Sequence, residues 1–182
     1  MHNGESIEIC NAQGYGVYKR VVLAFIEQLD AALQIHNRVL VVNLFFSINY
    51  YTETNEIFSK FIKNLIQYLG RHYDINKVGY QWVREQEKAK KQHYHLALIL
   101  DGNKIQNPRK LNEIIREKWL PKGSIHIPDN CFYYIDKHNM SAERLKAIYR
   151  ASYMAKTRGK QYRPIQTKDY NCSRLKFDIS SV

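Results

Sequence analysis

Cysteine is scarce in this chain, and its placement excludes two classes of small protein. Only three of the 182 residues are cysteine (Cys10, Cys131 and Cys172), and no two of them form a Cys-x-x-Cys pair. An odd, widely spaced set supports neither a disulfide scaffold nor a zinc ribbon. Such usage is typical of a reducing compartment, so we expect a cytoplasmic protein.

Long hydrophobic runs are also missing. The longest, residues 39–48 and 96–100, are far shorter than the ~20 apolar residues that a membrane-spanning helix needs. No basic-then-apolar segment at the N-terminus resembles a signal peptide. No repeat, low-complexity segment or linker interrupts the chain. We therefore expect no membrane contact, and a single domain over residues 15–182 preceded by a polar tail at residues 1–14.

Acidic residues are outnumbered by basic ones. Seventeen Asp and Glu stand against 28 Lys and Arg, which gives a net charge of +11. A surplus of this size favours a polyanionic partner, most often a nucleic acid. The ten basic and three acidic residues after residue 140 include a stretch, residues 156–177, in which cations alternate with aromatic rings. That mixture suits single-stranded DNA, although a solvated basic tail has the same composition.

Apolar residues, by contrast, are abundant at 45%, with 13% aromatic, so the chain can build a packed core. Apolar residues at helical spacing predict four helices, over residues 18–35, 57–69, 107–119 and 141–157. β-branched and aromatic runs predict strands over residues 39–46, 78–87, 92–100, 124–127 and 132–135, with a hairpin turn at 88–91. The order predicts an α+β fold: a ferredoxin-like or RRM-like antiparallel sheet with helices packed on one face.

One predicted strand carries two histidines on the same face. Side chains alternate along a strand, so His93 and His95 point the same way and lie roughly 7 Å apart at the backbone. Both rings can converge on one divalent ion. The partner strand offers Glu85 as a third ligand, with Glu87 at the turn in reserve, and such a set leaves coordination positions open for a substrate. Unliganded histidines are the alternative. Two further histidines have no spacing that brings them in, namely His72 and His126.

The last predicted helix places three functional side chains on one face. Tyr149, Tyr153 and Lys156 stand at positions i, i+4 and i+7, so either hydroxyl could reach one reactive centre. A tyrosine hydroxyl is a poor nucleophile unless its phenolate is stabilised or its substrate is activated. Lys156 supplies a cation beside Tyr153, and a metal at a phosphate would supply the electrophilic half. A packed aromatic stripe is the alternative.

Taken in order, these motifs resemble the HUH superfamily of single-strand DNA nickases. The run YQWVREQE, the strand HYHLALIL and the segment SYMAK followed by basic residues are most similar to rolling-circle replication initiators of filamentous phages and related prophage elements. The resemblance covers residues 39–176. The family's first motif, usually a Thr-rich strand, is degenerate here as VVNLFFSINY, so the resemblance depends on the other two motifs.

The resemblance implies a metal-dependent, site-specific endonuclease and strand transferase acting on single-stranded DNA. Attack on a scissile phosphate would leave a 5′-phosphotyrosyl link and a free 3′-hydroxyl, and the link would conserve the energy for rejoining. The implied roles are metal ligands for Mg²⁺ or Mn²⁺ (His93, His95, Glu85), primary nucleophile (Tyr153), second tyrosine (Tyr149), helper cation (Lys156) and DNA contacts (Arg158, Lys160, Arg163, Arg174).

The implied partners follow from the same resemblance. The substrate would be a single-stranded origin or its hairpin, in the cytoplasm of a bacterial host that carries the phage or prophage element. Because the chain has no helicase-sized extension, a separate helicase would open the duplex. The basic C-terminal segment, from about residue 157 to 182, is expected to help hold the DNA.

Three other functions remain open from the sequence. A non-catalytic module that binds single-stranded DNA or RNA on the same sheet would not need the hydroxyl of Tyr153. A relaxase or transposase of the same fold would share the chemistry but serve transfer instead of replication. A metal hydrolase would turn over without any covalent protein–DNA adduct.

Overall fold

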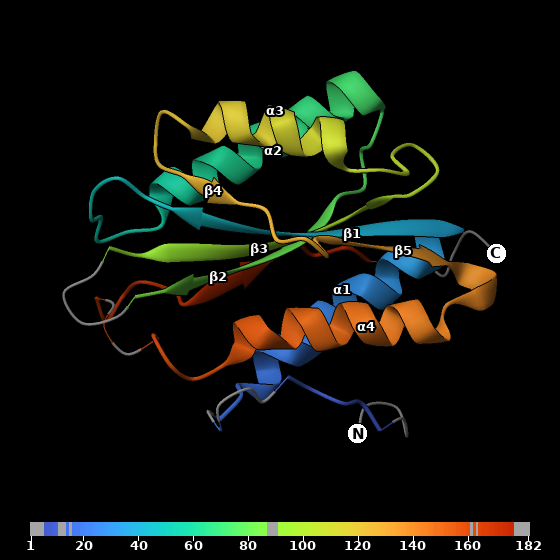
Figure 1. Cartoon of the computed structure of the whole chain (residues 1–182), viewed down its shortest axis with the longest axis horizontal. Helices are drawn as coiled ribbons and strands as arrows, with labels where there is room; N and C mark the ends of the chain where they lie inside the picture. Colours follow the sequence, from blue (N-terminus) through green and yellow to red (C-terminus); the bar gives the residue numbers. More distant parts are fainter. Residues whose placement is uncertain are drawn as a thin grey trace.

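The computed structural model describes residues 6–10, 14, 16–86, 91–160, 162 and 164–176. Over these residues the chain forms four α-helices and a six-stranded antiparallel open sheet (Figure 1), which confirms the predicted α+β class. The helices are α1 (Lys19–Ile35), α2 (Glu56–Tyr73), α3 (Arg109–Trp119) and α4 (Ser141–Ser152). The strands are β1 (Arg38–Ser47), β2 (Gly79–Glu85), β3 (His93–Asp101), β4 (Ile125–His126), β5 (Phe132–Asp136) and β6 (Tyr170–Cys172).

The sheet is ordered β4-β1-β3-β2-β6, and β5 also pairs with β1. β4 and β5 share the outer edge of β1, because β4 pairs with Phe45 and Phe46 while β5 pairs with residues 38–42. β6 forms the opposite edge by pairing with β2. The hairpin predicted between β2 and β3 is present as an antiparallel pair, although residues 87–90 of its turn lie outside the described residues.

The helices cover both faces of the sheet, which corrects the prediction of helices on one face only (Figure 1). α2 and α3 pack on one face, and α1 and α4 on the other. The reason is visible in β1, where alternate side chains such as Leu40 and Val42 enter one core cluster while Val39 and Val41 enter the other. A strand that is apolar on both sides must be covered on both sides.

α4 ends earlier than the apolar pattern indicates. The α-helix stops at Ser152, and a 3₁₀ turn, η3 (Tyr153–Ala155), follows. Residues before α1 hold this turn, because the backbone N–H of Tyr18 donates to the carbonyl oxygen of Ala155 at 2.8 Å and Val17 forms an isolated β-bridge with Lys156. Tyr153 is therefore the first residue of the 3₁₀ turn and the residue that follows the last turn of α4.

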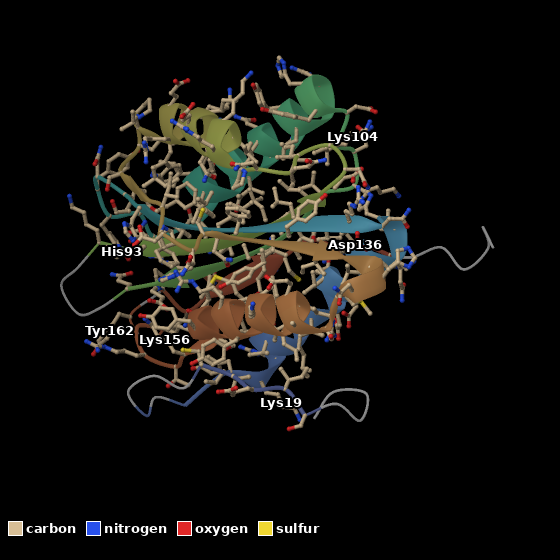
Figure 2. The ribbon with its side chains drawn as sticks, turned by 45° about the vertical axis from the view of Figure 1, so that its right-hand side comes forward. Lys19, His93, Lys104, Asp136, Lys156 and Tyr162 are labelled. Carbon is tan, nitrogen blue, oxygen red and sulfur yellow. The ribbon has the colours of Figure 1, made fainter. Side chains whose placement is uncertain are left out.

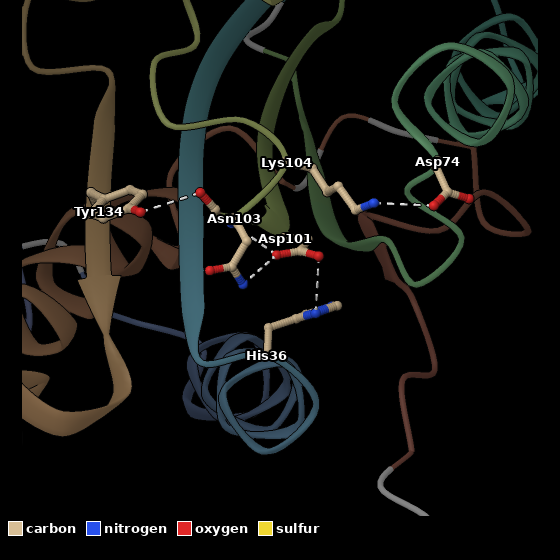
Figure 3. A network of polar contacts seen from close by, with 7 residues as sticks. His36, Asp74, Asp101, Asn103, Lys104 and Tyr134 are labelled. Carbon is tan, nitrogen blue, oxygen red and sulfur yellow. Dashed lines mark hydrogen bonds and ion pairs between the residues drawn. The ribbon is translucent and has the colours of Figure 1, made fainter.

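The end of the sheet at which β3 finishes is closed by a polar network (Figure 3). The Asp101 carboxylate accepts from the backbone and side-chain N–H groups of Asn103, both at 2.9 Å, and lies 3.5 Å from His36 Nδ1. Nearby, Lys104 pairs with Asp74 at 3.1 Å. These contacts fix the turn after β3, so this cluster has a structural role.

Within the described ranges, no helix has both the length and the apolar character needed to cross a membrane.

Candidate active site

The pairing of β2 with β3 places the predicted carboxylate beside the predicted histidines. Glu85 is opposite His93, and His95 is opposite Val83 two residues further along. Alternation therefore puts Glu85, His93 and His95 on one face of the sheet, the face that α1 and α4 cover. The three residues lie where β2 ends and β3 begins, at the end of the sheet away from Asp101.

Glu85 is the centre of a buried charge cluster. Its Oε2 lies 3.1 Å from His95 Nε2 and 3.3 Å from Lys156 Nζ, and its Oε1 lies 3.5 Å from Lys160 Nζ. The Glu85 side chain is 14% exposed and that of Lys160 only 1%. The segment carrying Lys160 is held against the end of β2, because the backbone N–H of Gln86 donates to the carbonyl oxygen of Gly159 at 2.7 Å.

The protonation states in this cluster follow from its contacts. Burial alone would raise the pKa of Glu85, but the hydrogen bond and charge of His95, with the charges of Lys160 and Lys156, lower that pKa to about 2. Burial lowers the pKa of Lys156, yet its hydrogen bond to Tyr153 and the charge of Glu85 raise it above its usual range overall. Glu85 is therefore a carboxylate, and Lys156 an ammonium, at neutral pH.

Tyr153 joins this cluster through Lys156. The Lys156 ammonium donates to the Tyr153 hydroxyl at 3.0 Å and lies 4.2 Å from the centre of its ring. The Tyr153 ring in turn lies 6.2 Å from the His95 ring, centre to centre. A hydroxyl, an ammonium, a carboxylate and an imidazole thus form one contact chain, although Tyr153 and His95 come from different elements.

Tyr149 faces a different part of the molecule. Its side chain is 42% exposed and lines a cavity of about 780 Å³ with Glu8 and Tyr133, away from the residues that contact Glu85. A hydrogen bond with Cys10 raises its pKa. Tyr149 and Tyr153 therefore have different neighbours, and in this arrangement the two hydroxyls do not share one centre. The role of second nucleophile for Tyr149 stays a prediction.

The metal ligands predicted from the sequence are neighbours, but they do not form a ready site. Two imidazoles and one carboxylate suit a divalent transition ion such as Mn²⁺, whereas Mg²⁺ prefers oxygen donors. His95 Nε2 and Glu85 Oε2 already lie 3.1 Å apart. His93 is exposed beside them. Over the residues that the structure describes, no three His, Cys, Asp or Glu are arranged to hold a metal. The donor types therefore fit a divalent ion, and His93 would have to turn inward to complete the set.

The predicted DNA-contacting cations divide into three groups. Arg158 and Arg174 are exposed. Lys160 is buried and is directed at Glu85, and it also donates to the carbonyl oxygen of Lys156. Its ammonium therefore pairs with Glu85 inside the protein and is not presented at the surface. Arg163, and Glu87 as the reserve ligand, lie outside the described residues.

Two residues beside the cluster were not expected from sequence. His126 in β4 is opposite Phe45 in β1, and the two rings are stacked at 5.8 Å. The Phe45 ring also meets the His95 ring edge-on at 4.7 Å. The alternation of β1 could have indicated that Phe45 shares the face of Val41, but nothing in the sequence fixed the pairing of the two-residue strand β4.

Replacing Lys160 with methionine should leave the free energy of unfolding within about 1 kcal/mol of the wild-type value. Glu85 keeps Lys156 and His95 as partners, so no buried charge is left uncompensated, and removing the buried ammonium also removes its desolvation cost. Urea unfolding at pH 7 measures this. A loss well above about 2 kcal/mol would show instead that Lys160 is needed to hold the site together.

Comparison with known proteins gives one match. The family model described as the YagK/YfjJ C-terminal domain matches residues 7–173, which include every residue of the cluster around Glu85. No curated protein and no solved structure matches the chain.

Proposed function

We propose that this chain, which belongs to the YagK/YfjJ C-terminal domain family, is a tyrosine endonuclease and strand transferase. It would nick single-stranded origin DNA in the manner of HUH replication initiators. The observation that carries the proposal is the contact chain from the Tyr153 hydroxyl through Lys156 and Glu85 to His95. A hydroxyl nucleophile beside a fixed cation, with metal-ligating residue types next to it, suits phosphoryl transfer better than it suits binding alone.

Lys156 has a defined task in this reaction. Tyr153 must lose its proton to attack, and the Lys156 ammonium at 3.0 Å from the hydroxyl oxygen stabilises the phenolate that forms. Glu85 holds Lys156 in place through the 3.3 Å ion pair. The attack forms a bond from the Tyr153 oxygen to phosphorus and breaks the bond from phosphorus to the 3′ oxygen. The proton that Tyr153 releases to water matches the one that the leaving 3′ oxygen takes up, so no net proton is consumed.

His93, His95 and Glu85 would hold the divalent ion. When bound, Mg²⁺ or Mn²⁺ would polarise the scissile phosphate and offset its negative charge. The low pKa of Glu85 keeps this carboxylate available as a ligand throughout the neutral range.

The charge and aromatic content near the cluster support a single-stranded substrate. The net charge is +11, and cations such as Arg158 are exposed close to the cluster. Tyr162 is 49% exposed, and Figure 2 shows it at the same end of the molecule as His93 and Lys156. Exposed rings can stack on unpaired bases while the cations bind phosphates.

The test is a denaturing gel with 3′-end-labelled single strands that tile the non-coding DNA of the chain's own replicon. The 5′-phosphotyrosyl link retains the downstream fragment, so a 3′ label stays with the protein. We expect a labelled protein band in Mn²⁺ or Mg²⁺ that is lost in EDTA, and an upstream fragment that a polymerase can extend.

Two results would contradict the proposal. Binding without cleavage or adduct across the whole set of strands would indicate a binding module. Multiple turnover without any adduct, followed over time, would indicate a hydrolase instead.

A further inference from the structure

A groove beside the cluster has the composition of a binding site for the same substrate. We propose that the groove between α1 and β6 holds single-stranded DNA that flanks the scissile phosphate, an inference that rests on the proposed function. The groove encloses about 440 Å³, within the range of ligand sites. It is lined by Arg20 of α1, by the segment before β6, and by β6 with Arg174 after it; its cations are Arg20, Lys168 and Arg174.

The charge of the groove favours a phosphate chain. Three cations line it against one carboxylate, Asp169. The groove therefore keeps a positive surplus beside the cluster, which is what a strand of phosphates needs.

The aromatic residues favour a single strand over a duplex. The Arg20 guanidinium lies 5.9 Å from the centre of the Tyr18 ring and 5.6 Å from that of Tyr170, so two rings hold it in place. A guanidinium fixed in this way presents planar donors to a phosphate at low entropic cost. Tyr170 is partly exposed in the groove and offers a ring face on which an unpaired base can stack.

The groove is linked to the cluster by strand pairing and by a contact of the residue before α1. Tyr170 is opposite Val83 in β2, and Val83 is opposite His95 in β3. On the α1 side, Tyr18 donates its backbone N–H to Ala155, the last residue of the turn that carries Tyr153. A strand with its scissile phosphate at Tyr153 therefore has this groove within a few nucleotides.

The experiment measures DNA binding in a Tyr153→Phe background, so that cleavage does not interfere. The probe is a fluorescein-labelled oligothymidylate of about 20 nucleotides, followed by anisotropy over a range of salt concentrations. Arg20→Gln with Arg174→Gln should weaken binding by about 10-fold, and the log–log salt slope should fall by about 1.4, the value for two lost phosphate contacts. Arg20→Lys should give an intermediate loss of affinity, because lysine keeps the positive charge but lacks the planar pair of N–H donors of the guanidinium.

The matched control is Arg109→Gln. Arg109 is 89% exposed on α3, on the opposite face of the sheet, and should change affinity by less than about twofold. A double variant that binds like this control would overturn the proposal. An equal loss of affinity for a duplex of the same length would also overturn it, because that result would mean that these arginines attract any DNA by charge and do not form a groove for a single strand.

A second measurement does not depend on any variant. Cys172 lines the groove, whereas Cys10 lies near Ser152 on another side, where its backbone N–H donates to the Ser152 hydroxyl. Oligothymidylate should slow alkylation of Cys172 by N-ethylmaleimide several-fold and leave Cys10 unchanged, as read by peptide mass spectrometry. Unprotected Cys172 at saturating DNA would contradict the groove assignment. If the binding and protection effects are seen but no covalent adduct ever forms, the nickase proposal is contradicted and the groove proposal is still supported.

Discussion

Tyr153→Phe is expected to reduce the rate of covalent adduct formation by at least about a thousandfold, because removing a nucleophile leaves only binding and electrostatic effects. The substitution deletes one oxygen, the acceptor of the 3.0 Å hydrogen bond from Lys156. The ring and its contacts with Lys156 and His95 can remain. DNA affinity should therefore stay within about twofold of the wild-type value.

The measurement is a time course of adduct formation with the 3′-labelled strand, alongside anisotropy for binding. Tyr149→Phe is the matched control, since it removes the same atom from a residue one turn earlier that faces Glu8 and Tyr133. It should leave the first nick unchanged. The reverse pattern, an adduct in Tyr153→Phe that disappears in Tyr149→Phe, would assign the nucleophile to Tyr149 and require a different geometry from the one described.

Glu85→Gln is expected to destabilise the metal-free protein by about 3–5 kcal/mol at pH 7, the usual cost of removing one partner of a buried ion pair. The Lys160 side chain is 1% exposed and would lose its carboxylate. Lys156 and His95 would lose the same partner. Three groups would be left facing an amide that carries no charge.

The same cluster predicts how stability depends on pH. The pKa of Glu85 is about 2 when folded, against a usual value of 4.5. Between these values the unfolded chain binds a proton that the folded chain does not, so stability falls as pH falls. The contribution is fully present above about pH 5 and decreases by roughly 3 kcal/mol towards pH 2. Because Gln has no such titration, the difference between wild type and Glu85→Gln should narrow over this range.

Urea unfolding in EDTA at several pH values between 2 and 7 tests both statements. Glu113→Gln is the control, because Glu113 makes an exposed pair with Arg109 at 3.7 Å and should cost less than about 0.5 kcal/mol. A difference between wild type and Glu85→Gln that stays constant down to pH 2 would mean that the carboxylate is not held ionised by its neighbours.

The main elements could be predicted because the core is strongly patterned. Helical spacing identified α1 as a helix, and a continuous apolar run identified β1 as a strand. The predicted bounds of both elements are within a residue or two of the observed ones. β6 could not be predicted, since its three residues have no alternation of their own and form a strand only by pairing with β2. The second helical layer was missed because local pattern does not tell on which face of the sheet a helix packs.

The site was predictable where it depends on alternation. Placing His93, His95 and Glu85 on one face needed only the hairpin and the two-residue period of strands. Lys160 could not be recognised as a buried partner of Glu85, because the two residues are 75 positions apart and Lys160 lies in a segment without helical or strand periodicity. The different surroundings of Tyr149 and Tyr153 were equally hidden, since they depend on residues distant in the sequence, Glu8 beside Tyr149 and Glu85 behind Lys156.

The distance along the chain between the two halves of the site has a consequence for synthesis. His95 emerges from the ribosome more than fifty residues before Tyr153, and Lys160 follows later still. A nascent or truncated chain that ends before Tyr153 lacks the hydroxyl that the proposed nicking needs, and it lacks Lys156 and Lys160 as well. Nicking by this site would therefore be withheld until nearly the whole domain has been translated, and a chain interrupted earlier would leave the strand intact.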